Sequence, residues 1–184
     1  TNTTGFVEIP EFIDNYKVTS IDSEAFLYAD ISDVKIPDTI ESINAYAFSG
    51  CQNLKNINFP ENLKFLGAWS FAETGLEEVA IDCPELKIMG GVFRNTPVKY
   101  ADINAKNIPS NIFYLCNNLE YVHIGSCVEI IAPYAFDDCT VNNIKIDDGL
   151  KYVGLYAFNT NGNSIISFPD TVEIMGILPL SKGY

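Results

Sequence analysis

Pairs of apolar residues two positions apart recur along the chain at intervals of about 22 residues. Two residues with this spacing in an extended chain point to the same side, so each pair predicts a short strand with both apolar side chains directed inward. The seven pairs are Val34/Ile36, Ile57/Phe59, Val79/Ile81, Ala101/Ile103, Val122/Ile124, Ile144/Ile146 and Ile166/Phe168. Pro37, Pro60 and Pro169 directly follow three of these pairs, where a residue without an N–H group ends a ladder.

Phenylalanine returns with the same period. The repeat phenylalanines are Phe26, Phe48, Phe71, Phe93, Phe113, Phe136 and Phe158, with spacings of 22, 23, 22, 20, 23 and 22 residues. Before most of them, apolar residues three apart, such as Leu63 and Leu66, bring the chain back across a core. Glycines follow this return segment, and we expect a positive φ at each of them: Gly67, Gly90, Gly154 and Gly176.

These repeated units predict a solenoid. A strand of about three residues is not stable alone, but copies stacked at roughly 4.8 Å as a parallel sheet cover one another's apolar edges. The hydrophobic content of 47% then belongs to columns of inward positions that run the length of the array.

The repeat also carries a family resemblance. The segment AFSGCQNLKNINFPENLKFLG, residues 47–67, contains an A-F-x-x-C run and a strand that ends in proline, and it resembles the BspA-like leucine-rich repeats. This resemblance implies a right-handed superhelix with a parallel β-sheet of short strands on a concave face and irregular or turn segments on the other. The asparagine ladder of other leucine-rich repeats is replaced here, by Pro, Asp82, Asn104, Gly125 and Asp147 in successive copies.

We expect a single leucine-rich repeat domain over residues 1–184, with about seven repeats of 20–23 residues from Phe26. Residues 6–25 are expected to form a hairpin-like cap, because the first copy holds five additional residues, IDNYK. The last repeat, about 166–184, ends without a polar capping unit, which predicts that the printed residues belong to a longer chain or that something else covers this end. The short copy after Phe93 predicts an irregular curvature near residues 108–113.

Charge and length narrow the classes of partner. The 184 residues carry a formal net charge of −13, which excludes a basic footprint for nucleic acid or anionic lipid. No apolar run approaches the roughly 20 residues that span a bilayer, so membrane insertion is not expected. The first residues, TNTTGFVEIP, lack the pattern of a signal peptide, and we expect any secretion signal or anchor to lie outside these residues.

The five cysteines do not form a recognisable metal or disulfide pattern. Cys51, Cys116 and Cys139 each follow a repeat phenylalanine by three residues, which favours a column of small buried side chains over metal ligands or disulfides. Cys83 and Cys127 stand two turns apart, about 10 Å, which is too far for a disulfide. No C-x-x-C motif is present, and no metal site or cofactor is assigned.

The outward positions of the predicted strands give the candidate site. His123, the only histidine, lies between inward Val122 and Ile124, with Asp102 and Lys145 expected beside it on the neighbouring strands. A second outward row is Asp33, Asn56, Glu78, Tyr100, Tyr121, Asn143 and Ile165. Tyr100 and Tyr121 are thus expected side by side, either as part of a partner-binding surface or as a cross-strand pair that stabilises the sheet.

These observations lead to three hypotheses for the function of the chain. The first is a non-enzymatic module that binds a protein or glycan partner through Tyr100, Tyr121, Asp102, His123, Glu78, Asn143 and Lys145. The resemblance implies an extracellular or cell-surface protein of host-associated bacteria or protists, linked to adhesion to host matrix or other cells. The second is a structural spacer within a larger surface protein. The third, a metal or catalytic site around His123 and Asp102, lacks a nucleophile and a third ligand, so no catalytic residue is assigned.

Overall fold

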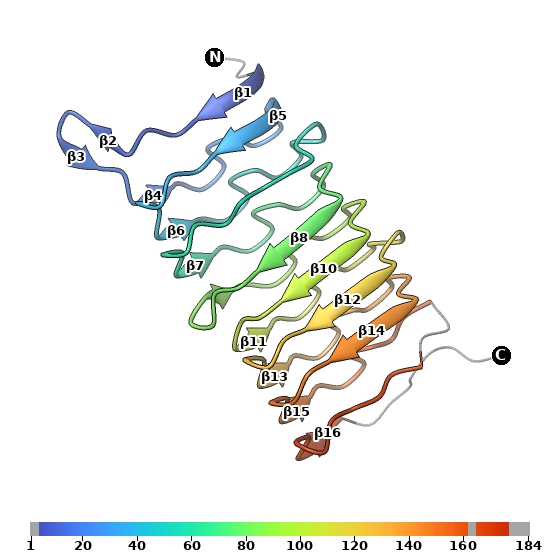
Figure 1. The fold of residues 1–184 in the computed structure, drawn as a ribbon. Coiled ribbons are helices and arrows are strands. Elements are labelled where there is room, and N and C mark those ends of the chain that lie inside the picture. Colours follow the sequence, from blue (N-terminus) through green and yellow to red (C-terminus); the bar gives the residue numbers. More distant parts are fainter. Residues whose placement is uncertain (1–3, 162–164, 177–184) are drawn as a thin grey trace.

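The computed structural model describes residues 4–161 and 165–176. Within these residues the chain forms a solenoid of short parallel strands and contains no helix (Figure 1). Most turns place one strand on the face that carries the candidate site, which we call the strand face, and a second, shorter strand on the return side. The predicted repeat-solenoid fold is therefore confirmed.

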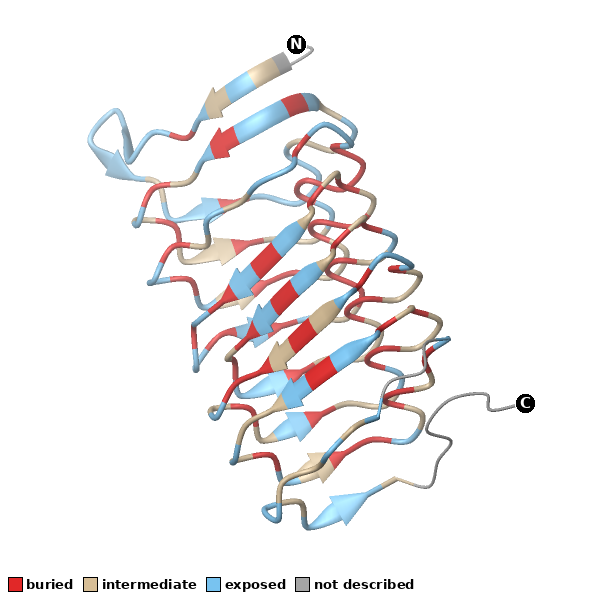
Figure 2. Ribbon diagram, turned by 45° about the vertical axis from the view of Figure 1, so that its right-hand side comes forward, coloured by how far each residue is buried: buried red, intermediate tan, exposed pale blue. Residues whose placement is uncertain are grey.

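The strand face contains two separate ladders. Strands β1 (Thr4–Glu8) and β5 (Asp30–Lys35) pair with each other, and β8 (Glu78–Ile81), β10 (Tyr100–Ile103), β12 (Tyr121–Ile124) and β14 (Asn143–Ile146) form a four-stranded parallel sheet. Buried and exposed residues alternate along these strands (Figure 2), because successive side chains of a strand point to opposite faces.

Two of the seven predicted strands do not form. Ile57/Phe59 and Ile166/Phe168 occupy their expected inward positions and pack partly buried against the core, but neither segment is a strand. Both are followed by proline, at 60 and 169, whereas the residues that follow β10, β12 and β14 each donate an N–H to the preceding turn. These donors are Asn104 to Ile81, Gly125 to Ile103 and Asp147 to Ile124, at 2.7, 2.9 and 2.9 Å. A three-residue ladder that lacks this last hydrogen bond is too short to hold its register.

The return side is more regular than predicted. Two four-stranded parallel sheets stand where irregular segments were expected. Their strands are β4 (Ser20–Ile21), β6 (Ser42–Ile43), β7 (Phe65–Leu66) and β9 (Lys87–Ile88), then β11 (Asn107–Ile108), β13 (Ile130–Ile131), β15 (Tyr152–Val153) and β16 (Ile174–Met175). The two sheets are separated between β9 and β11, in the copy that is only 20 residues long. The expected irregularity near residues 108–113 is thus a break between ladders.

An antiparallel hairpin projects from the first turn (Figure 1). Strand β2 (Phe12–Ile13) pairs with β3 (Tyr16–Lys17), and the additional residues IDNYK build its turn. Asp14 and Asn15 connect the strands with φ of 48° and 66°, the left-handed values that a two-residue hairpin turn requires. The last predicted repeat falls partly on residues 177–184, which lie outside the described residues.

The repeat phenylalanines form a continuous stack along the turn side of the core. Neighbouring rings from Phe26 to Phe158 lie 5.0–6.1 Å apart between centroids, with interplanar angles of 6–23°. The backbone N–H of each phenylalanine from Phe26 to Phe136 donates to the next turn, for example from Phe48 to the Ser70 carbonyl at 2.8 Å. The stack therefore joins every turn, including those whose strand-face ladders are interrupted.

Left-handed residues precede every ring of the stack and follow every ring except Phe158, and the expected glycines are not among them. The positions two before the phenylalanines all have positive φ, and they include Tyr46, Trp69 and Tyr134 at 58°, 61° and 60°. The predicted positive φ at Gly67, Gly90, Gly154 and Gly176 is wrong. Three of these glycines are needed for close packing between turns, since a Cβ at Gly67 would lie 2.4 Å from the Ala45 nitrogen and one at Gly154 2.3 Å from the Pro133 nitrogen.

A column of small polar side chains follows the stack. Thr74, Thr96 and Cys139 donate to the carbonyl of the phenylalanine in their own turn, and Cys51 and Cys116 donate to the phenylalanine of the turn before. All five cysteines are free, and Cys51, Cys116 and Cys139 are buried. Burial raises the pKa of the Cys51 thiol to about 11 and raises those of Cys116 and Cys139 as well. These side chains are a structural column, as expected.

Candidate functional site: the strand face

The four-stranded sheet brings the predicted site residues together. Tyr100 on β10 is in register with Glu78 on β8 and with Tyr121 on β12, and Tyr121 is in register with Asn143 on β14. The parallel register also places His123 between Asp102 and Lys145. All seven residues thus lie in two adjacent rows on the outward side of one sheet, as the alternation predicts.

Tyr100 and Tyr121 are in register on neighbouring strands, but their rings do not stack. Tyr100 is 45% exposed, and its hydroxyl donates to Glu120 Oε2 at 3.1 Å. This hydrogen bond and the negative charge of Glu120 raise the pKa of the Tyr100 hydroxyl. Among the residues that the structure describes, the rings of Tyr100 and Tyr121 are not in stacking contact. Their faces are therefore not used to stabilise the sheet by stacking.

His123 is held by two carboxylates. Its Nδ1 lies 3.0 Å from Asp102 Oδ1, and its Nε2 lies 2.9 Å from Asp147 Oδ2. Lys145 Nζ is 2.8 Å from Asp147 Oδ1 and 3.5 Å from His123 Nε2. The Lys145 hydrogen bond, with His123 second, lowers the pKa of Asp147, and Asp147 in turn raises that of Lys145. The result is a network of polar contacts across β10, β12 and β14, in which Lys145 and Asp147 form an ion pair.

Asp147 is the member of this network that sequence reasoning missed. It follows β14 by one residue, and so it points to the same side as Lys145, beside Gly125 in the turn before. The available signal was that Asp147 follows its apolar pair, Ile144/Ile146, by one residue, which places it on the outward side of the sheet.

The network does not have the geometry of a catalytic or metal centre. Both ring nitrogens of His123 are engaged by carboxylates, which lie at opposite ends of the imidazole and so do not converge on one point. In residues 4–161 and 165–176, no group of three or more histidine, cysteine or acidic side chains has the arrangement of a metal site. What the network does is fix the direction of the polar side chains on the sheet.

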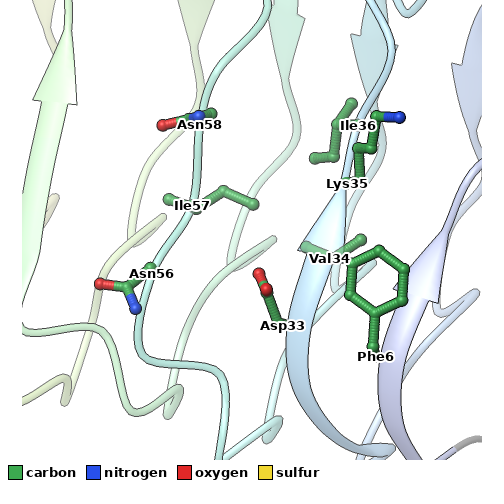
Figure 3. Close-up of a pocket in the computed structure, with 8 residues that line it drawn as sticks. All are labelled: Phe6, Asp33, Val34, Lys35, Ile36, Asn56, Ile57 and Asn58. Carbon is green, nitrogen blue, oxygen red and sulfur yellow. The ribbon is translucent and has the colours of Figure 1, made fainter.

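A second feature of the strand face lies at the interruption between its two ladders. A depression of about 320 Å³ lies between β5 and residues 56–58 and is lined by Phe6, Asp33, Val34, Lys35, Ile36, Asn56, Ile57 and Asn58 (Figure 3). The side chains of Asp33 and Ile57 lie in the space between the two segments. A further depression of about 540 Å³ continues on the other side of residues 57–61, toward Ala80 and Asp82. Because every strand was expected to form, sequence reasoning missed this feature.

The model of the BspA type leucine-rich repeat region matches residues 19–106 and 106–177, with six copies in all. The chain belongs to the BspA-type leucine-rich repeat family. This family membership agrees with the sequence repeat and with the parallel solenoid described above.

Solved leucine-rich repeat proteins share the fold of this BspA-type chain. A Bacteroides ovatus protein is 21% identical with a TM-score of 0.66, and the alignment covers 93% of this chain and 53% of that one. The T. pallidum leucine-rich repeat protein is 22% identical with a TM-score of 0.69, covering 82% and 72%. A leucine-rich cell surface protein of Faecalibacterium prausnitzii is 24% identical with a TM-score of 0.58, covering 93% and 43%. This chain thus spans about half of the length of the Bacteroides ovatus protein.

Comparison with curated proteins finds no match. Over the described part of this BspA-type chain, no helix has the length and hydrophobicity needed to cross a membrane. Leucine-rich repeat arrays present extended surfaces and act as interaction modules, and this general role fits the strand face.

The aromatic row on the turn side of this BspA-type array is engaged in packing. Tyr46 and Trp69 stack at 6.0 Å, and the Arg94 guanidinium lies 4.6 Å from the Trp69 ring centroid. Tyr134 and Tyr156 stack at 5.4 Å. Since Tyr46 comes from the turn before Trp69 and Arg94 from the turn after it, this row ties neighbouring turns together.

Proposed function

We propose that the chain is a non-enzymatic binding module that recognises a protein or glycan partner through the strand face, centred on Tyr100 and Tyr121. The observation that carries this proposal is the continuous sheet β8–β10–β12–β14, which holds Glu78, Tyr100, Tyr121 and Asn143 in one outward row. Aromatic residues on a rigid surface lose little conformational entropy on binding and are enriched at the centres of interfaces.

The charge network supports the same surface. Asp102, His123, Asp147 and Lys145 hold one another in place beside the tyrosines. Polar groups that are fixed before binding reduce the cost of ordering them in a complex. A partner would therefore meet two tyrosines flanked by alternating negative and positive groups, which gives specificity of orientation.

We also propose an extracellular or cell-surface location and a role in adhesion to host matrix or to other cells. Family membership and the description of the Faecalibacterium prausnitzii neighbour as a cell surface protein support this location.

The test compares two double variants against a panel of purified extracellular-matrix proteins and a glycan array. Y100A/Y121A should lose saturable binding to any panel member that the wild type binds, with a decrease in affinity of at least about tenfold. Tyr16 and Tyr28 are 80% and 72% exposed and lie outside the strand face, so Y16A/Y28A is the matched control and should bind normally.

Thermal melting distinguishes loss of the surface from loss of the fold. Both double variants should melt within about 2 °C of the wild type, because exposed substitutions usually change the free energy of unfolding by less than about 0.5 kcal/mol. Normal binding by Y100A/Y121A would assign the contact to another surface and contradict the proposed site, whereas no binding by the wild type to any panel member would support the structural spacer.

A further inference from the structure

Two exposed carboxylates lie beside the Tyr100 ring. Glu78 on β8 is in register with Tyr100, and Glu120, directly before β12, accepts the hydrogen bond of the Tyr100 hydroxyl at 3.1 Å. Within the described residues, neither glutamate is in a salt bridge. The lysine next to the ring in sequence, Lys99, is paired with Glu77 at 2.9 Å. The strand face therefore presents two negative charges to the solvent, one on each side of an aromatic ring.

The ring itself is also open to a ligand. Tyr100 is 45% exposed, and the described residues place no lysine or arginine over the ring of Tyr100 or Tyr121. An aromatic ring attracts a cation to its face, because the π electrons give that face a partial negative charge. Carboxylates form charge-assisted hydrogen bonds with the N–H groups of a guanidinium. An exposed ring between two carboxylates is thus suited to a planar cation with several N–H donors.

The turn side of the same array shows such a set with its cation in place. There the Arg94 guanidinium lies 4.6 Å from the Trp69 ring centroid and 5.5 Å from that of Tyr114. Its Nη1 is 3.9 Å from Glu73 Oε1. Two aromatic rings and a glutamate from neighbouring turns thus hold one arginine. Arg94 is the only arginine in the 184 residues, so an arginine on the strand face has to come from another molecule.

We propose that the strand face binds an arginine side chain of a protein partner, with the guanidinium over the Tyr100 ring and between the carboxylates of Glu78 and Glu120. This inference rests on the proposed function, because it names the chemistry of the partner at the same surface. Arginine fits better than lysine, since the planar guanidinium stacks on a ring and bonds two carboxylates at once. A net charge of −13 also favours the approach of a basic partner.

The probe is an acetylated and amidated heptapeptide, Gly-Ser-Gly-Arg-Gly-Ser-Gly, whose binding to the full ¹⁵N-labelled chain is followed by NMR chemical-shift titration. Saturable shifts are expected at the amides of residues 78, 100 and 121, with a dissociation constant on the order of millimolar for one such side chain. The lysine peptide should bind about threefold more weakly. The citrulline peptide keeps the planar shape without the charge and should bind at least about tenfold more weakly. Equal affinity for arginine and citrulline, or no binding of the arginine peptide, would overturn the proposal.

Charge-matched variants locate the contact. E78Q/E120Q should weaken binding of the arginine peptide about fivefold, because it removes both charges beside the ring. Glu11 and Glu173 are also exposed and lie outside the four-stranded sheet, directly before β2 and β16. E11Q/E173Q is therefore the matched control and should change the affinity by less than about twofold. Equal effects of the two double variants would show nonspecific electrostatic attraction and would contradict the assigned site.

Two substitutions of Tyr100 separate the contribution of the ring from that of its hydroxyl. Y100L removes the ring but keeps an apolar side chain, and it should weaken binding of the arginine peptide about fivefold. Y100F keeps a ring that also attracts a cation and should weaken binding by less than about twofold. The amide spectra of the free variants report whether each has folded. Equal losses in the two variants would show that the guanidinium does not lie over the ring.

Failure of this inference can be distinguished from failure of the proposed function. If Y100A/Y121A loses binding to a panel protein or glycan that E78Q/E120Q binds normally, the tyrosines contact a partner without an arginine, and only the arginine site is overturned. If the arginine peptide binds at residues 78, 100 and 121 but Y100A/Y121A binds every panel partner normally, the arginine site is supported and the proposed function is contradicted.

Discussion

The two parts of the strand face have the same inward apolar pattern but different backbone pairing. In the continuous part, β8 to β14, Val79, Val122 and Ile144 lie under a regular ladder. In the interrupted part, Ile57 stands at the equivalent position without a strand around it. The residue that follows the strand separates the two cases, since Asn104, Gly125 and Asp147 each donate an N–H that Pro60 lacks. Apolar periodicity thus sets where each turn lies, and a proline after the apolar pair accompanies the loss of sheet pairing at residues 57–59.

The largest loss of stability should come from substitutions in the phenylalanine stack, which both parts of the strand face share. Phe71 and Phe136 are completely buried, and each stacks between two other phenylalanines. Phe71→Ala and Phe136→Ala should each lower the free energy of unfolding by about 3–5 kcal/mol, because each leaves a large cavity. Urea denaturation followed by circular dichroism measures both. A loss below about 1.5 kcal/mol for Phe71→Ala would mean that the interrupted part does not depend on the stack.

Alanine substitutions of two isoleucines at the same repeat position should affect stability differently in the two parts of the strand face. Ile144 is 6% exposed within the continuous ladder, and Ile57 occupies the same repeat position but is only partly buried. Ile144→Ala should cost about 3 kcal/mol, and Ile57→Ala about half as much, because less apolar surface is removed from water at Ile57. The same denaturation experiment compares them. Equal losses of stability would indicate that Ile57 is as well buried as Ile144 and that the two parts do not differ in packing.

The role of the donor after the strand can be tested in the continuous part. Asn104 donates its N–H to Ile81, and its side chain also contacts Asp82 and the Cys127 N–H. Asn104→Ala removes only the side-chain contacts. Asn104→Pro removes the backbone donor as well and should cost about 2 kcal/mol more than Asn104→Ala. Amides of β8 and β10 should also exchange faster in the proline variant alone, and equal stability of the two variants would contradict the proposed cause.

The smallest effect concerns the charge network of the continuous part. Lys145 and His123 hold the pKa of Asp147 below its ordinary value, so the ionised carboxylate stabilises the fold above about pH 4. That contribution disappears as the pH falls through the lowered pKa of the folded state. Asp147→Asn should therefore lose about 0.5 kcal/mol at neutral pH, since the network is exposed, and this difference from the wild type should close as the pH falls through the lowered pKa. Urea midpoints at a series of pH values measure it, and a difference independent of pH would show that charge is not the cause.

The sequence was sufficient for the solenoid and for the position of each site residue on it. The two-residue alternation predicted that Tyr100 and Tyr121 are neighbours and that His123 lies between Asp102 and Lys145, because equivalent positions of successive repeats stack in register. It did not reveal the two missing strands, because Pro60 and Pro169 resemble Pro37, which follows a six-residue strand long enough to keep its pairing with β1.

Other differences arise from interactions between turns. The glycines were expected at positive φ, yet Gly67 and Gly154 are required by the backbone of the preceding turn. The positive φ values belong instead to residues such as Tyr46 and Trp69, for which single-residue preference predicts the opposite. Gly125 is likewise required by the preceding turn, since a Cβ there would lie 2.6 Å from Asn104 Oδ1.

The buried thiol column has a consequence for chemical reactivity. A thiol reacts as its thiolate, so the raised pKa values of Cys51, Cys116 and Cys139 make all three unreactive at neutral pH, and their burial keeps oxidants away. Each also has a carbonyl acceptor inside the core. A free thiol held in this way survives in an oxidising compartment as well as in a reducing one. Either cysteine or threonine can therefore occupy these buried positions, and the free thiols are compatible with an extracellular location.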